Sequence, residues 1–202
     1  MENGHGLLER DLLILEEMVE GLGAYLLSDS TYWITAIDLP KLTIGGCLMR
    51  LRRLRILTDL LSPTEQSRFQ LVEQRFQAII HEQVVRFEHR THQELRARLQ
   101  EWMQDLRGYR LTNAADYADK VDVRVLMADT LDYLAQPPYR TDPKIEHELA
   151  QLDEHLCHRW QSGDFVWPAI WQAAYPAETY WWLYGRVVEE AVRIRPIPLP
   201  TP

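Results

Sequence analysis

Three side chains in the middle of the chain have the types and spacing of a helical metal site. His81, Glu88 and His92 are seven and four residues apart, so on one helix they would share a narrow face. Carboxylate and imidazole groups on helices hold metal ions in several bundle enzymes. A complete site needs a further ligand from a second helix, and the sequence identifies none. A metal-dependent helical-bundle enzyme is therefore an alternative, and our first expectation is a protein without metal or other cofactor.

The second group with chemical potential is aromatic and lies near the end of the chain, around the stretch YPAETYWWLYGR at 175–186. Planar rings stack on sugars and bases, and they anchor protein partners. They also cover the open end of a helical bundle, and this structural role is our first interpretation. The candidate ligand or partner surface consists of Trp171, Tyr180, Trp181, Trp182 and Tyr184.

An aromatic-lined pocket for a small apolar or sugar ligand is a further alternative, and it would use Trp171, Trp181 and Trp182. Adjacent residues of a helix point about 100° apart, so the core should favour one member of the Trp181–Trp182 pair. Trp181 aligns with Tyr184 and Val188 at helical spacing. We therefore predict that Trp181 is mostly buried and that Trp182 is less so.

Charged residues argue against nucleic-acid binding. The run RLRRLR at 50–55 carries four arginines that point in different directions on a helix. A later predicted helix carries a series of aspartates, which favours Arg–Asp pairs between helices; these are Asp116, Asp119, Asp122, Asp129 and Asp132. The formal net charge of -8 also works against binding to nucleic acids and anionic membranes.

The length and composition indicate one globular domain. The chain has 202 residues, of which 46% are hydrophobic and 26% charged, and these values are ordinary for globular proteins. The sequence starts with acidic residues among its leucines, unlike a signal peptide, and no run approaches the roughly 20 apolar residues of a membrane span. Cys47 and Cys157 are far apart and form no metal-binding pair, so we expect reduced, buried thiols in a cytoplasmic protein.

Helical periodicity dominates the chain. It predicts an all-α antiparallel bundle of about five or six helices, with one long helix at about 63–107 that begins at the capping pattern Ser62–Pro63–Thr64–Glu65. We expect an irregular aromatic C-terminal segment with a last helix or extended piece at 179–194, and one short extended piece near 31–37. A single domain would cover 1–195, followed by a proline-rich tail at 196–202. The other predicted helices span 6–27, 44–61, 114–135 and 143–163.

No familiar catalytic motif is present. The chain lacks a glycine-rich phosphate loop, a GxSxG motif and an HExxH motif. His147, Glu154 and His158 have metal-like types, but they lie opposite the apolar stripe of their helix and should be solvated. The function we expect is therefore that of a non-enzymatic cytoplasmic protein that acts through a protein partner or self-association, without nucleic-acid or membrane binding.

Overall fold

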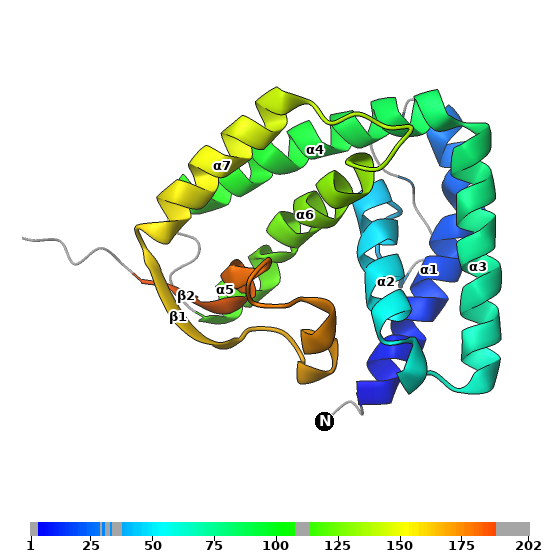
Figure 1. Cartoon of the computed structure of the whole chain (residues 1–202), viewed down its shortest axis with the longest axis horizontal. Helices are drawn as coiled ribbons and strands as arrows, with labels where there is room; N and C mark the ends of the chain where they lie inside the picture. The colour runs from blue at the N-terminus through cyan, green and yellow to red at the C-terminus, as the bar shows by residue number, and fades with distance from the viewer. Residues whose placement is uncertain (1–3, 29, 31–32, 34–37, 108–113, 189–202) are drawn as a thin grey trace, which may run out of the picture.

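The computed structural model describes residues 4–28, 30, 33, 38–107 and 114–188. Its described part is dominated by helices, which confirms the predicted all-α class (Figure 1). The α-helices are α1 (Gly4–Leu27), α2 (Ile44–Ile56), α3 (Pro63–Glu82), α4 (Val84–Arg107), α5 (Ala114–Lys120), α6 (Asp122–Leu134) and α7 (Pro143–Cys157). Within the described residues, none of these helices combines the length and apolar character needed to cross a membrane.

The starts of three helices are set by short-range caps. Ser62 accepts a hydrogen bond from the backbone N–H of Glu65, and the Glu65 carboxylate accepts one from the backbone N–H of Ser62. This is the predicted capping box of α3, and Pro63 is the first residue of that helix. Thr43 and Asp142 cap α2 and α7 in the same way, each by accepting a backbone N–H.

The predicted long helix at 63–107 is divided into two. Gln83, with φ -122 and ψ 34, ends α3, and α4 then turns sharply away from it (Figure 1). Phe76 of α3 and Phe87 of α4 meet edge to face inside the corner at 6.3 Å, and Tyr133 of α6 packs against both. The break lies at Gln83 because the corner there brings both phenylalanines into one core.

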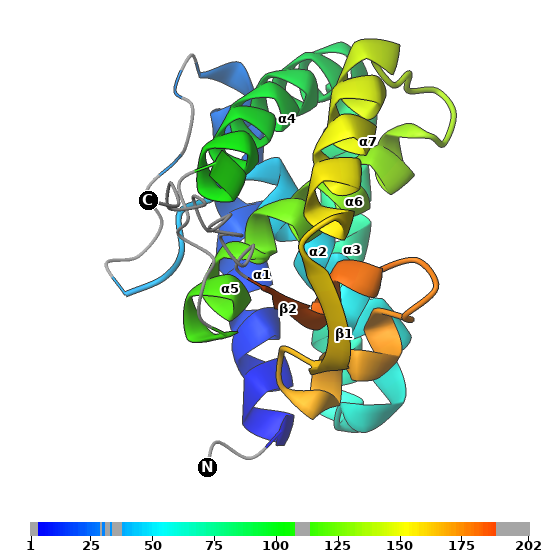
Figure 2. The same cartoon turned by 90° about the vertical axis from the view of Figure 1, so that its left-hand side faces the viewer.

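The helices form two packed groups that share α2. Helix α1 packs against α2 and α3, while α6 packs against α2 and α4, and α7 packs against α4. Figures 1 and 2 show α4 lying across one end of the α1–α3 group and continuing beside α7. Because α2 is central, ten of its thirteen residues are buried, and these include Arg50 and Arg53.

The C-terminal part is a hairpin. Of the helix or extended piece predicted at 179–194, the extended alternative is confirmed over 184–187, and no α-helix forms over the described residues. Strand β1 (Trp160–Phe165) pairs antiparallel with β2 (Tyr184–Val187), with Trp160 opposite Val187. The aromatic connection between them contains two short 3₁₀-helices, η2 (Ala169–Ala174) and η3 (Trp181–Leu183). A third, η1 (Thr58–Leu60), follows α2. The predicted helix at 143–163 ends earlier, at Cys157, because the chain then enters β1.

Other expectations fall mostly outside the described residues. Of the predicted extended piece at 31–37 only Trp33 is described, and it forms an isolated antiparallel bridge with Leu42. The proline-rich tail at 196–202 lies outside the described residues. The single-domain boundary at 1–195 therefore stays a prediction.

Candidate functional site

The aromatic segment packs against buried arginines of α2. The Arg53 guanidinium carbon lies 3.7 Å from the ring centroid of Trp171, and its Nε donates a 3.0 Å hydrogen bond to the Tyr175 hydroxyl. Arg53 is 3% exposed, and its Nη1 lies 3.4 Å from Asp11 of α1. A buried cation is stable only when it is paired and hydrogen-bonded, so this arrangement ties the segment to two helices.

Arg52 forms the neighbouring contact. Its guanidinium carbon lies 4.8 Å from the Tyr180 ring centroid, and its Nε donates to the backbone oxygen of Ala174. Arg52 also pairs with Asp129 and Asp132 of α6 at 3.8 and 3.5 Å. This confirms the predicted pairing of arginines and aspartates between helices.

Asp129 has the most unusual environment in this cluster. Its carboxylate accepts a 2.7 Å hydrogen bond from the Tyr180 hydroxyl, and the residue is 5% exposed. Burial raises the pKa of Asp129 to about 6, although the hydrogen bond from Tyr180 and the nearby Arg52 act in the opposite direction. The carboxyl group thus changes its charge close to neutral pH.

A third arginine, Arg124 of α6, holds the other end of the segment. Its guanidinium carbon lies 3.7 Å from the Trp182 ring centroid, and two nitrogens donate to the two carboxylate oxygens of Asp153 in α7 at 2.8 and 2.7 Å. The sequence interpretation missed Arg124. Its position within the apolar run DVRVLM is the available signal, because an arginine there needs a partner.

The predicted burial order of the two adjacent tryptophans is wrong. Trp182 is 4% exposed, whereas Trp181 is only half-buried. The pair lies on a 3₁₀-helix instead of an α-helix, and that local turn directs Trp182 under Arg124. Trp181 packs edge to face on Trp160 of β1 at 5.6 Å.

All five candidate aromatic residues have a structural partner, and that of Trp181 is the Trp160 ring. Arg53 lies over Trp171, Arg52 over Tyr180 and Arg124 over Trp182. Tyr184 is half-buried, and its hydroxyl donates to the backbone oxygen of Tyr175 at 2.7 Å. One face of each arginine-bound ring is therefore occupied, which favours a structural role over a stacking platform.

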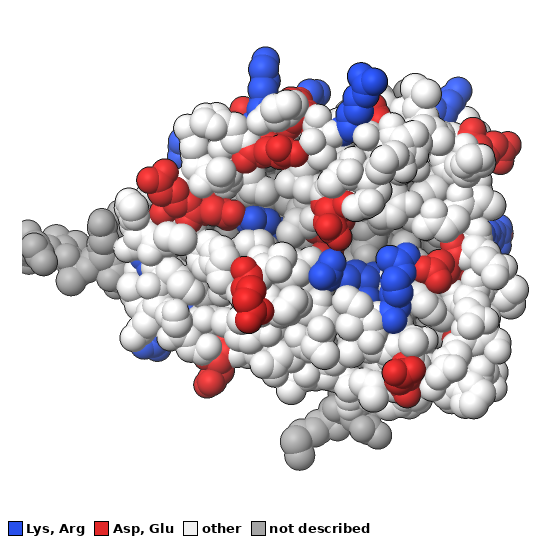
Figure 3. Space-filling model, viewed as in Figure 1, with Lys and Arg blue, Asp and Glu red and all other residues white. Residues whose placement is uncertain are grey.

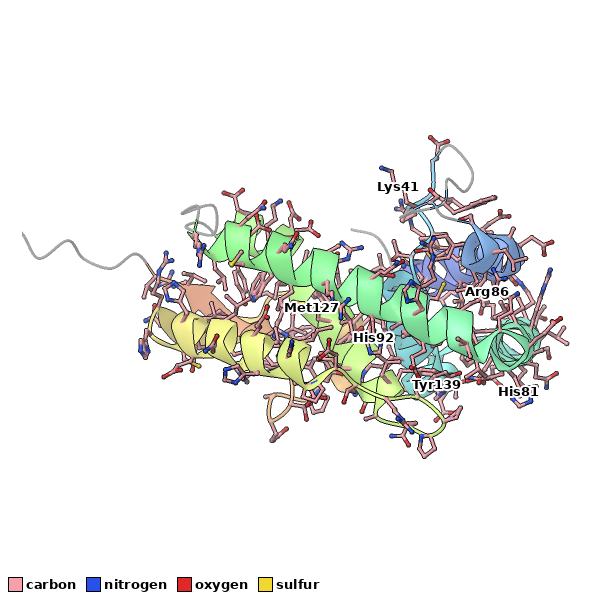
Figure 4. All side chains as sticks on the ribbon, turned by 90° about the horizontal axis from the view of Figure 1, so that it is seen from above. Lys41, His81, Arg86, His92, Met127 and Tyr139 are labelled. Carbon is pink, nitrogen blue, oxygen red and sulfur yellow. The ribbon has the colours of Figure 1, made fainter. Side chains whose placement is uncertain are left out.

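The structure does not bring the candidate metal ligands together. His81 is exposed near the end of α3, and the corner at Gln83 separates it from Glu88 and His92 of α4. Figure 4 shows His81 and His92 at different positions along the molecule. Glu88 accepts a hydrogen bond from the backbone N–H of Arg140. In the described ranges, no group of three or more His, Cys, Asp or Glu side chains is arranged to hold a metal ion.

The remaining titratable candidates differ in exposure. His147, Glu154 and His158 are exposed, as expected. Cys47 is buried, and burial raises the pKa of its thiol to about 12, so it is a poor nucleophile. Cys157 is exposed, which makes the expectation of two buried thiols wrong for that residue. It is exposed because α7 ends there, with its buried stripe finishing at Leu156.

A groove between α4 and α7 is an open feature that the sequence interpretation did not identify. It has a volume of about 820 Å³, and Figure 4 shows the two helices side by side. Its apolar lining consists of Leu99, Met103, Leu106, Ile145 and Leu152. Met103 and Leu152 are half-buried, so they can contact a ligand without rearrangement of the core.

Charged side chains surround this apolar lining. The basic residues are Arg96, Arg107 and Lys144, and the acidic residues are Asp142 and Glu148. Arg96 and Asp142 form an ion pair at 2.9 Å. The groove thus has a small basic excess in an acidic chain.

Comparison with family models, curated proteins and solved structures finds no match for this chain. Its function therefore has to be argued from its own surfaces and sites.

Proposed function

We propose that this protein acts without catalysis by binding an amphipathic helix of another protein in the groove between α4 and α7. The observation that carries the proposal is the apolar lining of this groove, framed by charged residues from both helices. Helix-in-groove recognition uses the same combination, because apolar anchors give affinity and the charged border sets orientation.

The dimensions of the groove fit about three helical turns. Its lining on α4 runs from Arg96 to Arg107, which corresponds to about 16 Å at a rise of about 1.5 Å per residue. A partner helix of that length presents apolar residues at positions i, i+3 or i+4, and i+7. Met103 suits such a contact because the flexible thioether side chain adapts to irregular surfaces.

The charge of the groove indicates an acidic partner helix. Arg96 is already paired with Asp142. Of the other charged lining residues, Arg107 and Lys144 are positive and Glu148 is negative, which leaves one positive charge in excess. Electrostatic complementarity chiefly increases the association rate and selects among partners. We therefore propose a partner helix with leucine-type anchors and glutamate or aspartate at its flanks.

We place this activity in the cytoplasm. Cys47 and Cys157 are both free thiols, which is the usual state in a reducing compartment. The net charge of -8 favours solubility and works against non-specific binding to nucleic acids and anionic membranes.

A designed peptide tests this proposal directly. The probe is a fluorescein-labelled acidic amphipathic helix with leucines at i, i+3 and i+7, and its affinity is measured by fluorescence anisotropy. We expect wild-type protein to bind it, and Met103→Glu to weaken binding by about tenfold or more, since about 1.4 kcal/mol corresponds to a factor of ten. The matched control is Val85→Glu, because Val85 is 81% exposed on α4 and is not part of the groove lining.

Two outcomes would contradict the proposal. One is an affinity that Met103→Glu leaves unchanged, and the other is equal binding of a basic peptide with the same leucines. A concentration-dependent dimer on a sizing column, lost in Met103→Glu, would assign the groove to a second copy of the chain instead.

A further inference from the structure

A second, polar cleft lies on the other side of α4 from the groove. It has a volume of about 520 Å³ and is bordered by α1, α2, α4 and α6. Figure 4 shows Lys41, one of its lining residues, on the opposite side of α4 from α7. The volume falls within the range of small-molecule sites, and unlike the groove the cleft contains a deeply buried guanidinium.

The buried guanidinium belongs to Arg50, which is 8% exposed. Its Nη1 donates a 2.9 Å hydrogen bond to the backbone oxygen of Gly46. Its Nε lies 3.5 Å from Asp11 but forms no hydrogen bond. Asp11 also forms an ion pair with Arg53, so one carboxylate lies beside two buried cations. The unbonded Nε is buried and faces Asp11, so a ligand in the cleft would reach Arg50 through the other nitrogens of its guanidinium group.

Asp122 lines the same cleft, and within the described part of the chain its carboxylate forms no hydrogen bond or ion pair, although Arg53 and Arg50 lie near enough to act on its charge. Burial raises the pKa of its carboxyl group, whereas the nearby Arg53 and Arg50 act in the opposite direction. A guanidinium and a carboxylate therefore border one cleft without forming an ion pair with each other. A ligand with two opposite charges can bridge them.

The other charged lining residues are already engaged. Glu94 accepts hydrogen bonds from the backbone N–H groups of Ile44 and Gly45 at 2.8 and 3.2 Å, and a Cβ on Gly45 would lie 3.0 Å from its carboxylate. Arg98 donates to Glu101 at 3.1 Å. The lining has three cationic and three anionic side chains in total, namely Lys41, Arg50, Arg98, Glu94, Glu101 and Asp122.

This balance favours a ligand without net charge over a simple anion, because an added net charge would lack a counterion in the cleft. The rest of the lining is largely apolar and includes Met18, Met49 and Leu126. These three residues are 1%, 5% and 7% exposed, so they form the closed floor of the cleft and the charged groups dominate its accessible lining.

We propose that this cleft binds a free α-amino acid with an uncharged side chain. Its carboxylate contacts Arg50, and its ammonium group contacts Asp122. Guanidinium groups bind carboxylates with strong, directional hydrogen bonds, and an ammonium group supplies the donors that Asp122 can accept. The assignment is independent of the proposed peptide groove.

The test compares L-leucine with two derivatives that each lack one charge. Titrations of the full chain are followed by calorimetry and by NMR chemical shifts. We expect L-leucine to bind, and N-acetyl-L-leucine and L-leucine methyl ester to bind at least about tenfold more weakly, because each leaves one buried charge unsatisfied. No binding of L-leucine up to about 10 mM, a weak limit on the affinity scale, would overturn the proposal.

A pair of variants locates the site. Asp122→Asn should weaken L-leucine binding by about tenfold or more, as loss of a charge-assisted contact does, and should leave the affinity for N-acetyl-L-leucine unchanged. Asp119→Asn is the control, since Asp119 is exposed on α5 and is not part of the cleft lining. Equal affinities of wild type and Asp122→Asn for L-leucine, or tight binding of the acetylated compound, would place the ligand elsewhere.

Discussion

Arginines that are buried or half-buried are the individual residues that organise the described part of this protein. Arg53, Arg52 and Arg124 each stack on an aromatic ring and each pair with an aspartate from another helix. Stacking on a ring and pairing with a carboxylate together offset the cost of removing a guanidinium from water. Their contacts hold the aromatic segment between β1 and β2, which has little regular structure, against α2 and α6.

The tryptophan pair gives a direct test of this cover. Trp182→Ala should lower the free energy of unfolding by about 3–5 kcal/mol, as truncation of a buried tryptophan does. Trp181→Ala should cost distinctly less, because Trp181 is only half-buried. Urea denaturation of both variants measures the difference. A larger loss for Trp181→Ala would contradict the arrangement of the segment.

Asp129 should make stability depend on pH. Burial raises the pKa of Asp129 to about 6 in the folded protein, so the folded state binds this proton more tightly than the unfolded state does. Its contribution to stability is therefore present at low pH and is lost as the pH rises through about 6.

The variant Asp129→Asn removes this titration. Wild type should gain about 2 kcal/mol of unfolding free energy between pH 7 and pH 4.5 from this proton, by the linkage between pKa and unfolding. The variant lacks this gain, so its stability relative to wild type should be about 2 kcal/mol lower at pH 4.5 than at pH 7. Denaturation of both proteins at the two pH values measures the effect. The same stability difference at both pH values would show that Asp129 does not titrate in this range.

The C-terminal hairpin requires a glycine at one position of its second strand. Gly185 in β2 has φ +154, and a Cβ at this position would lie 2.2 Å from the backbone oxygen of Gln161. A side chain here would be strained and would also separate the strands. The hairpin carries both ends of the aromatic segment, so its pairing determines where that segment begins and ends.

Two alanine substitutions test this requirement with a matched control. Gly185→Ala should destabilise the protein by about 1–3 kcal/mol or more, given the strained φ and the close contact. Gly163→Ala in β1 should have a small effect, since its Cβ would lie 3.6 Å from the nearest atom, an ordinary contact. Thermal denaturation compares them, and equal midpoints would contradict the described strand pairing.

The distribution of charge on the described surface bears on nucleic-acid binding. Figure 3 shows acidic and basic side chains intermixed on one face, with wide areas that carry neither. Several arginines of the run at 50–55 are directed inward, where Arg50 and Arg53 are buried, and Arg55 pairs with Glu73 at 2.6 Å. Phosphate binding needs several free cations on one face.

We accordingly expect no specific or salt-dependent binding to duplex DNA or RNA. Anisotropy titrations of labelled duplexes at low salt should give no saturable signal at micromolar protein. A complex whose logarithmic affinity falls with logarithmic salt at a slope of several units, about 0.9 per DNA phosphate contacted, would refute this expectation.

Short-range patterns in the sequence predicted the helical class and the capping box at Ser62, because the capping hydrogen bond joins residues three positions apart. Apolar stripes likewise identified the buried faces of most helices. The sequence also located the aromatic segment, since eight aromatic residues lie within 165–184. Periodicity and capping are local properties, so a single sequence is sufficient to read them.

Tertiary packing decided the rest. The corner at Gln83 depends on Phe76 and Phe87 sharing a core with Tyr133, and the order of burial at Trp181 and Trp182 depends on where Arg124 lies. Arg124 and Asp153 are 29 residues apart, and the groove and the polar cleft each require helices that are distant along the chain. Periodicity specifies which face of a helix is apolar, but the neighbour that covers this face is selected by the packing of the whole molecule.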